Sequence, residues 1–224
     1  MNVIPEDDAA LFDWVAANLY TAVLSDSCDH MGHRNQALGP EIRPTDESLV
    51  LVGRAKTVLW SDFYHIPDGN PYEGEIRAVD SIRAGDIVVM ATGASTRNAP
   101  WGELMSTACV QRGGRGAVTD GLIRDVRRIR ALNLPVYARG YKPVDSRGRG
   151  QVVAFDVPVE LSGVRIHPGD LVVGDLDGVV VVPRAVERQI LELAHEKVTK
   201  EDHTREELEQ GSLLADVYAK YGVL

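Results

Sequence analysis

The chain has 224 residues, of which 44% are hydrophobic and 25% charged, as expected for a folded protein of one large or two small domains. Its formal net charge of −9 repels phosphate backbones, which argues against general nucleic-acid binding. No apolar run approaches the roughly 20 residues that span a bilayer, and the acidic start lacks a signal-peptide pattern. We therefore expect a cytoplasmic protein without a membrane span.

The first predicted elements are helices followed by a strand. Apolar residues at helical spacing predict a helix over residues 8–23, and a short second helix over 26–31 ends at Gly32. Residues 48–59 are rich in Val and Leu and predict a core strand. Residues 66–75 favour turns and lack apolar periodicity, which predicts a surface loop.

Turns before apolar runs predict further strands. A turn over residues 83–86 precedes the apolar run 87–91, and a similar turn over 167–170 precedes residues 171–173. Two β-rich runs flank Asp177-Gly178, which is typical of a hairpin because such a turn needs positive φ.

The C-terminal part is predicted to be helical. Pro183 closes the last strand and opens a helix over 184–203, and an amphipathic helix follows over 205–221. The last helix fits either a contact with another subunit or a solvated surface. Helices at both ends and strands between them predict one α/β domain over residues 1–224.

The central segment carries the strongest functional signal. Residues 103–112 predict a helix that stops at Gly113-Gly114, and residues 117–120 predict a short buried strand. A ten-residue helix rises about 15 Å, and a five-residue strand returns about 16 Å. If the chain reverses at the glycines, Glu103 meets the pair Arg124-Asp125.

That meeting point suits an anionic, chelating substrate. Arg124 offers a planar fork of donors for a carboxylate or keto oxygen. Asp125 is a hard oxygen ligand for Mg²⁺ or Mn²⁺, and Glu103 can hold one of the ion's waters. The alternative is structural: Asp125 caps the following helix and Arg124 braces it. Unpaired backbone amides at the helix start would also attract a carboxylate; they belong to Gly102, Glu103, Leu104 and Met105.

Residues 101–105 (WGELM) and 116–125 (GAVTDGLIRD) resemble the core of RraA-like proteins. That family includes class II pyruvate aldolases acting on 4-hydroxy-4-methyl-2-oxoglutarate and 4-carboxy-4-hydroxy-2-oxoadipate. Weaker matches at 24–32 and 169–183 extend the similarity. The resemblance implies a swivelling β/β/α domain with helical N- and C-terminal segments, a core over about 20–183, C-terminal helices over 184–222, and homotrimers or homohexamers.

The resemblance also implies roles for individual residues. It makes Asp125 the metal ligand, Arg124 the ligand of the pyruvyl oxygen, and the amides of Glu103, Leu104 and Met105 the holders of the substrate. Glu103 itself stands where the aldolases tend to have Asp.

Three further positions are relevant to the predicted site: residue 128, a glutamate of the C-terminal region and the segment 62–75. Some members have a carboxylate three residues after the metal ligand, where this chain has Arg128. The resemblance also implies that a glutamate from a neighbouring chain's C-terminal region completes the site, and Glu201 or Glu196 can fill that role. The segment 62–75 is expected to line the substrate pocket.

The expected reaction is retro-aldol cleavage of a 4-hydroxy-2-oxo-dicarboxylate to pyruvate and a second oxo-acid, with oxaloacetate decarboxylation as a related activity. A water held through Glu103 is one candidate for the base, and the physiological substrate stays open. The alternative is a non-catalytic RraA-type regulator that binds and inhibits a ribonuclease, which needs a docking surface and no metal. A scaffold with residual decarboxylase activity is the third option.

Overall fold

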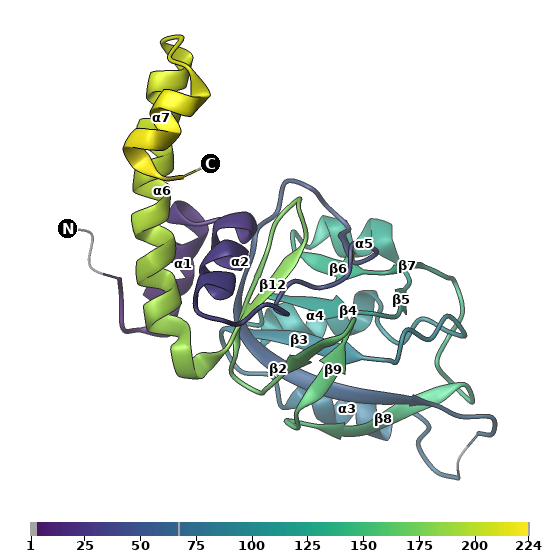
Figure 1. Cartoon of the computed structure of the whole chain (residues 1–224). Helices are drawn as coiled ribbons and strands as arrows, with labels where there is room; N and C mark the ends of the chain where they lie inside the picture. Colours follow the sequence, from purple (N-terminus) through teal and green to yellow (C-terminus); the bar gives the residue numbers. More distant parts are fainter. Residues whose placement is uncertain (1–3, 67, 224) are drawn as a thin grey trace.

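A curled eight-stranded sheet forms the centre of the computed structural model, which describes residues 4–66 and 68–223 (Figure 1). The strand order is β1-β6-β4-β3-β2-β11-β12, and β8 pairs with β2. The eight strands are β1 (Arg43–Pro44), β2 (Leu51–Asp62), β3 (Asp86–Ala91), β4 (Gly116–Thr119), β6 (Val136–Ala138), β8 (Gly150–Phe155), β11 (Leu171–Gly174) and β12 (Val179–Val182).

The middle of the sheet is parallel. β2, β3, β4 and β6 run in one direction, whereas β11 pairs antiparallel with both β2 and β12. Every residue of β4 is buried, as expected for a strand covered on both faces. The loops after β3 and β4 leave the same edge of the sheet, where α/β proteins usually bind ligands. Asp120 joins these loops, because its carboxylate accepts hydrogen bonds from the amides of Thr92 and Ala94.

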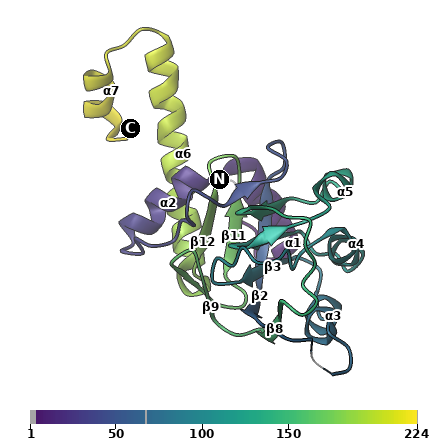
Figure 2. The ribbon, with the colours of Figure 1, turned by 90° about the vertical axis from the view of Figure 1, so that its right-hand side faces the viewer.

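Helices cover the sheet in two groups. Figure 2 shows α3 (Glu73–Asp80), α4 (Glu103–Gln111) and α5 (Val126–Ala131) along one face. Apolar side chains of these three helices share a buried core with residues of β3 and β4. The helices α1 (Asp8–Asn18) and α2 (Thr21–His30) instead pack with α6 (Glu187–Glu209) against β2, β11 and β12.

Two short strand pairs complete the central part. β9 (Val159–Leu161) and β10 (Val164–Ile166) form a hairpin, and β5 (Leu122–Ile123) runs parallel to β7 (Gly140–Tyr141). The second pair matters for function because β5 leads directly into the Arg124-Asp125 pair.

The C-terminal helices project from the sheet. After a short 3₁₀ turn, η1 (Arg184–Val186), α6 extends away from the central part, and α7 (Leu214–Tyr221) folds back along its far end (Figure 1). Among the described residues, no helix has the length and apolarity needed to cross a membrane.

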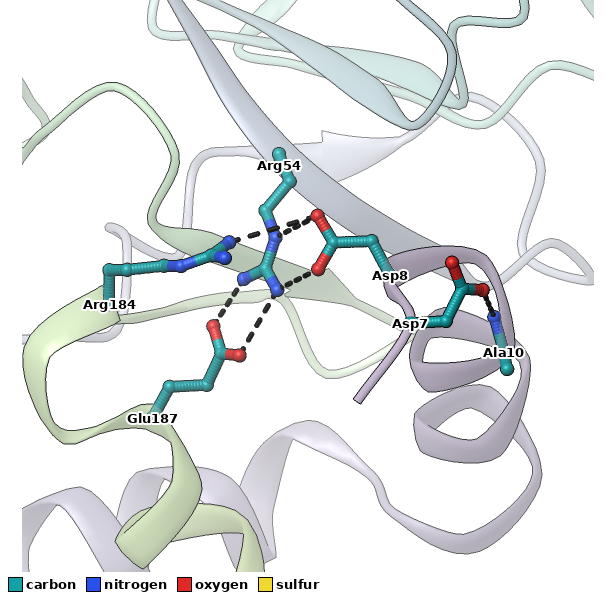
Figure 3. Close-up of polar contacts among 6 residues, drawn as sticks. All are labelled: Asp7, Asp8, Ala10, Arg54, Arg184 and Glu187. Atoms are coloured by element: carbon teal, nitrogen blue, oxygen red, sulfur yellow. Dashed lines mark hydrogen bonds and ion pairs between the residues drawn. The ribbon is translucent and has the colours of Figure 1, made fainter. Parts of the chain in front are cut away.

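A charge cluster around the buried Arg54 side chain fixes the start of α6 (Figure 3). Arg54 of β2, whose side chain is 9% exposed, pairs with Asp8 of α1 and Glu187 of α6, and Arg184 approaches Asp8 at 3.8 Å. Burial opposes the charge on Arg54, but its hydrogen bonds to the two carboxylates outweigh burial and raise its pKa. The cluster thus joins three elements that are remote in sequence.

Most predicted elements are confirmed, but the single helix over 8–23 is wrong. The chain leaves the helix at Leu19, which is extended, and a second helix starts at Thr21. Asp175 accepts hydrogen bonds from the amide and hydroxyl of Thr21, at 2.8 and 2.7 Å. The Asp175 carboxylate, remote in sequence, therefore stabilises the start of α2 at Thr21, although the spacing of apolar residues over 8–23 gives no sign of a break.

Two other boundaries are corrected. The predicted loop over 66–75 ends early, because α3 begins at Glu73. The predicted boundary between residues 203 and 205 is absent from the continuous helix α6; the chain turns instead at Gly211, whose φ is +91°. The extent of the domain, residues 1–224, stays a prediction.

Candidate functional site

The start of α4 lies beside the residues that follow β5. Trp101 and Ile123 form a parallel β-bridge, and the Arg124 amide donates to the Trp101 carbonyl at 3.0 Å. The chain reverses after α4 at Gly113, whose φ is +77°. The start of α4 and the Arg124-Asp125 pair therefore converge, as predicted from element lengths, and the Glu103 backbone amide lies 3.4 Å from Asp125 Oδ2.

A buried tryptophan holds the first turn of α4. Trp101 is 1% exposed, and its Nε1 donates to Ser106 Oγ at 2.8 Å. The Ser106 hydroxyl in turn donates to the carbonyl of Gly102 at 3.0 Å. These bonds fix the helix start, whose first amide groups have no carbonyl partner within the helix.

Gly102 allows the close approach of the two segments. A Cβ atom at this position would lie 2.9 Å from Asp125 Oδ2 and 3.1 Å from Arg124 Cγ. The φ of Gly102 is −152°, which other residues also adopt. Glycine is therefore needed here for space and not for its backbone freedom.

Asp125 directs its carboxylate to α4 and not to its own helix. It precedes α5 in a left-handed conformation, with φ 59° and ψ 28°, and makes no side-chain capping hydrogen bond. Its Oδ2 instead accepts the Glu103 amide at 3.4 Å and lies 3.5 Å from Arg124 Nε. Asp125 is the N-cap residue of α5 by position, but its side chain does not cap that helix, so this part of the structural alternative is wrong. A positive φ at a non-glycine residue is a conformation that functional sites often retain.

Arg124 contacts a second carboxylate that the sequence did not indicate. Its Nη1 lies 2.9 Å from Asp145 Oδ1, and its side chain remains 36% exposed. Tyr72 donates to the other oxygen of Asp145 at 2.6 Å. The segment after β7 and the start of α3 thus both contribute to the surroundings of Arg124.

These residues line a cavity of about 750 Å³, a size that suits a small molecule. Tyr72 and Glu75, at the C-terminal end of segment 62–75, lie in its wall; that this segment contacts the substrate stays a prediction. Arg128 also lines it. The remaining lining residues are Ile76, Val79, Asp80, Ala99, Pro100, Gly102, Glu103, Leu104, Met105, Ala108, Arg124, Asp125, Asp145 and Ser146.

The available donors fit one kind of metal ion. Within residues 4–66 and 68–223, no group of three or more His, Cys, Asp or Glu side chains could hold a metal. Mg²⁺ needs only one or two protein carboxylates when substrate and water fill its other positions, and Mn²⁺ also prefers oxygen ligands. Asp125, which is free of capping, fits that requirement. Glu103 lies along its own helix, where it accepts a hydrogen bond from Thr107 at 3.1 Å.

The two glutamates proposed for a neighbouring chain's site lie on the projecting helix α6. Glu201 accepts a hydrogen bond from the Tyr20 hydroxyl, and Glu196 pairs with Lys200 at 2.7 Å. Neither lines the cavity beside Arg124 and Asp125 in its own chain. Their contribution to a neighbouring subunit stays a prediction.

Comparison with known proteins assigns the family. Residues 21–181 match the family model described as Aldolase/RraA, and the chain belongs to this RraA-like family. A protein of Halalkalibacterium halodurans named "Putative 4-hydroxy-4-methyl-2-oxoglutarate aldolase" is 32% identical over 195 residues, 87% of each chain. A Shewanella oneidensis protein of the same name is 32% identical over 43% of this chain and 58% of its own length.

Solved structures confirm the predicted fold. The Streptomyces coelicolor protein RraAS2, described as an unusual member of the RNase ES inhibitor RraA protein family, is similar with a TM-score of 0.80 and 27% identity. The similarity covers 90% of this chain and all of that one. An uncharacterized Pseudomonas syringae protein also has a TM-score of 0.80, at 27% identity over 93% of this chain and 96% of its own. The α/β fold with helical ends is thus that of RraA proteins.

Proposed function

We propose that the protein is a lyase that uses Mg²⁺ or Mn²⁺ to cleave a 4-hydroxy-2-oxo-dicarboxylate into pyruvate and a second oxo-acid. Oxaloacetate decarboxylation is the related activity. The observation that carries this proposal is the position of Asp125 and Arg124 beside the start of α4, in the wall of the cavity. The name of the H. halodurans relative supports the same chemistry.

The start of α4 binds the pyruvyl end of the substrate. Amides of Leu104 and Met105, at the positive end of the helix, donate to the 1-carboxylate. Arg124 donates to the 2-oxo oxygen, where negative charge develops as the C3–C4 bond breaks. Asp125 would hold a divalent ion, which would supply Lewis-acid stabilisation of the developing negative charge.

Proton transfers complete the cleavage. The C4 hydroxyl gives its proton to a base as C4 becomes a carbonyl, and a water held by Glu103 is the candidate for that base. The electron pair of the C3–C4 bond forms the enolate, and a proton added at C3 then yields pyruvate. In oxaloacetate the same bond breaks, and C4 leaves as carbon dioxide.

The proposal includes an oligomer. Homotrimers or homohexamers would allow Glu201 or Glu196 of α6 to reach a neighbouring cavity.

The alternative function is that of a regulator that binds a ribonuclease, and it is suggested by the description of the S. coelicolor neighbour. That alternative does not account for the orientation of Asp125 toward α4, so we favour the enzyme.

The test is pyruvate release from oxaloacetate and from 4-hydroxy-4-methyl-2-oxoglutarate after chelator treatment. Activity is expected to disappear and to return with Mg²⁺ or Mn²⁺. Asp125→Ala should abolish it, whereas Asp29→Ala, at an exposed position of α2 outside the cavity lining, should not. Wild-type turnover that survives complete metal removal would contradict the proposal.

A further inference from the structure

Asp145 connects Arg124 to the segment that begins α3. One oxygen, Oδ1, contacts Arg124 Nη1 at 2.9 Å. The other, Oδ2, accepts hydrogen bonds from the Tyr72 hydroxyl at 2.6 Å and from the Arg147 amide at 3.1 Å. Because both oxygens are engaged, the carboxylate has a defined orientation toward the guanidinium.

A second hydrogen bond ties the same two segments together. Ser146 donates to Glu75 at 3.0 Å, and both residues are at least 95% buried. Gly74 brings α3 directly onto β8, since a Cβ atom there would lie 2.8 Å from the Val152 carbonyl. Residues 72–75 and 145–146 therefore form a clamp, a name we keep for these two segments.

The pKa shifts of Asp145 and Tyr72 agree with Tyr72 as the donor and Asp145 as the acceptor of their hydrogen bond. Burial raises the pKa of Asp145, but the bonds from Tyr72 and the Arg147 amide and the charge of Arg124 outweigh it and lower the pKa. The bond to Asp145 raises the pKa of Tyr72. At neutral pH Tyr72 therefore remains a donor and Asp145 an anion.

We propose that Asp145 is a positioning residue for Arg124, and that Tyr72 acts on the reaction through Asp145. This inference rests on the proposed function. An arginine side chain has considerable rotamer freedom, which must be lost when it binds a substrate oxygen. Fixing the guanidinium beforehand directs its remaining donors to the cavity and lowers that cost in the transition state.

A double-mutant cycle tests whether Tyr72 acts through Asp145. Tyr72→Phe removes a single hydroxyl, and we expect kcat/KM to fall about 2- to 10-fold, the range of one hydrogen bond. Asp145→Asn removes the charge, and a fall of about 10- to 100-fold is expected. In the Asp145→Asn background, Tyr72→Phe should lower kcat/KM by less than about twofold. If Tyr72 acts through Asp145, the effects of the two substitutions are coupled and do not add.

Oxalate binding gives a readout that needs no turnover. Oxalate is a planar dianion that resembles the enolate of pyruvate, and calorimetry in the presence of Mn²⁺ measures its affinity. Both variants should weaken oxalate binding by the factors given above, while Mn²⁺ affinity stays within about twofold because Asp125 is untouched. The matched control is Tyr218→Phe, at a half-exposed tyrosine of α7, which should change neither affinity.

The outcomes separate this inference from the proposed function. The positioning role would be overturned if Tyr72→Phe lowered kcat/KM by the same factor in the wild type and in Asp145→Asn. It would also be overturned if both single variants bound oxalate with wild-type affinity. If wild-type protein releases no pyruvate but its oxalate affinity depends on Tyr72 and Asp145 in a coupled way, the reaction is wrong and the positioning role stands. Tyr72→Phe changes no charge and no buried volume of consequence, so it should fold.

Discussion

Two arginines of this protein each contact two carboxylates, yet their surroundings differ. Arg54 bonds Asp8 and Glu187 through Nε, Nη1 and Nη2, and its side chain is 9% exposed. Arg124 makes one close contact, to Asp145, and its side chain is 36% exposed. An arginine with two acidic neighbours is therefore not by itself a sign of function.

The difference lies in what the remaining donors can reach. A hollow also lies beside Arg54, but all three guanidinium nitrogens already bond carboxylates of the same chain. Arg124 stands beside a helix start and a carboxylate free of capping, in the wall of the larger cavity. The first cluster joins elements, and the second can take a ligand.

The largest effect is expected on stability at Arg54. Arg54→Ala leaves the Glu187 carboxylate, whose side chain is 12% exposed, without its partner, and breaking a buried ion pair costs about 3–5 kcal/mol. Urea unfolding should show this loss in the free energy of unfolding. Arg184→Ala, at a side chain that is 57% exposed, should cost less than about 1 kcal/mol. An equal loss in the free energy of unfolding for Arg54→Ala and Arg184→Ala would contradict the distinction between a buried and an exposed ion pair.

In contrast to Arg54→Ala, Arg124→Ala should lower catalytic activity and leave the stability nearly unchanged. We expect kcat/KM for pyruvate release to fall about 10²- to 10³-fold, the usual cost of losing a donor to developing charge. Because this ion pair is partly exposed, the free energy of unfolding should change by less than about 1 kcal/mol. A variant that loses stability but keeps its activity would show that Arg124 belongs with Arg54 as a structural residue.

Gly102→Ala should act on the site through space alone. The added methyl group would meet Asp125 and Arg124 at about 3 Å and displace both, and small displacements of catalytic groups can cost about 10- to 100-fold in rate. Gly140→Ala is the control, since its Cβ would meet the flexible Leu122 side chain at 3.3 Å. Steady-state kinetics that do not distinguish the two variants would contradict the close-approach argument.

The smallest effect is a pH dependence of the Arg54 cluster. The hydrogen bond from Arg54 lowers the pKa of Asp8 below its usual 3.8, against the effect of burial. This pairing therefore stabilises the fold above pH 3.8 and is lost as the pH falls through the folded-state pKa. The difference in unfolding free energy between wild type and Asp8→Asn should shrink on acidification below about pH 4. A constant difference between pH 7 and pH 3 would argue against a role for the charge.

The predictable part of the site was the part set by local geometry. Glu103, Arg124 and Asp125 follow from the rise of one helix and the return of one strand, with glycines at the reversal. Neither Tyr72 nor Asp145 could be found in that way, because both come from segments without periodic patterns. Their meeting depends on the packing of α3 against β8, including the close approach at Gly74.

The fold shows the same division. Strands with continuous apolar runs, such as residues 171–174, and the hairpin with Asp177-Gly178 in its loop were predictable from sequence. The break between α1 and α2 was not, because the cap of Thr21 comes from Asp175, 154 residues away. The pairing of β8 with β2 shifts register at Leu59/Trp60, which no local pattern indicates.

The most direct test of the central claim is a Mn²⁺ titration of wild type and Asp125→Ala, followed by electron paramagnetic resonance. We expect one ion per chain in the wild type and a large loss of affinity in the variant, with the circular dichroism spectrum unchanged. An Asp125→Ala protein that binds Mn²⁺ with wild-type affinity and stoichiometry would contradict the assignment of Asp125 as the metal ligand.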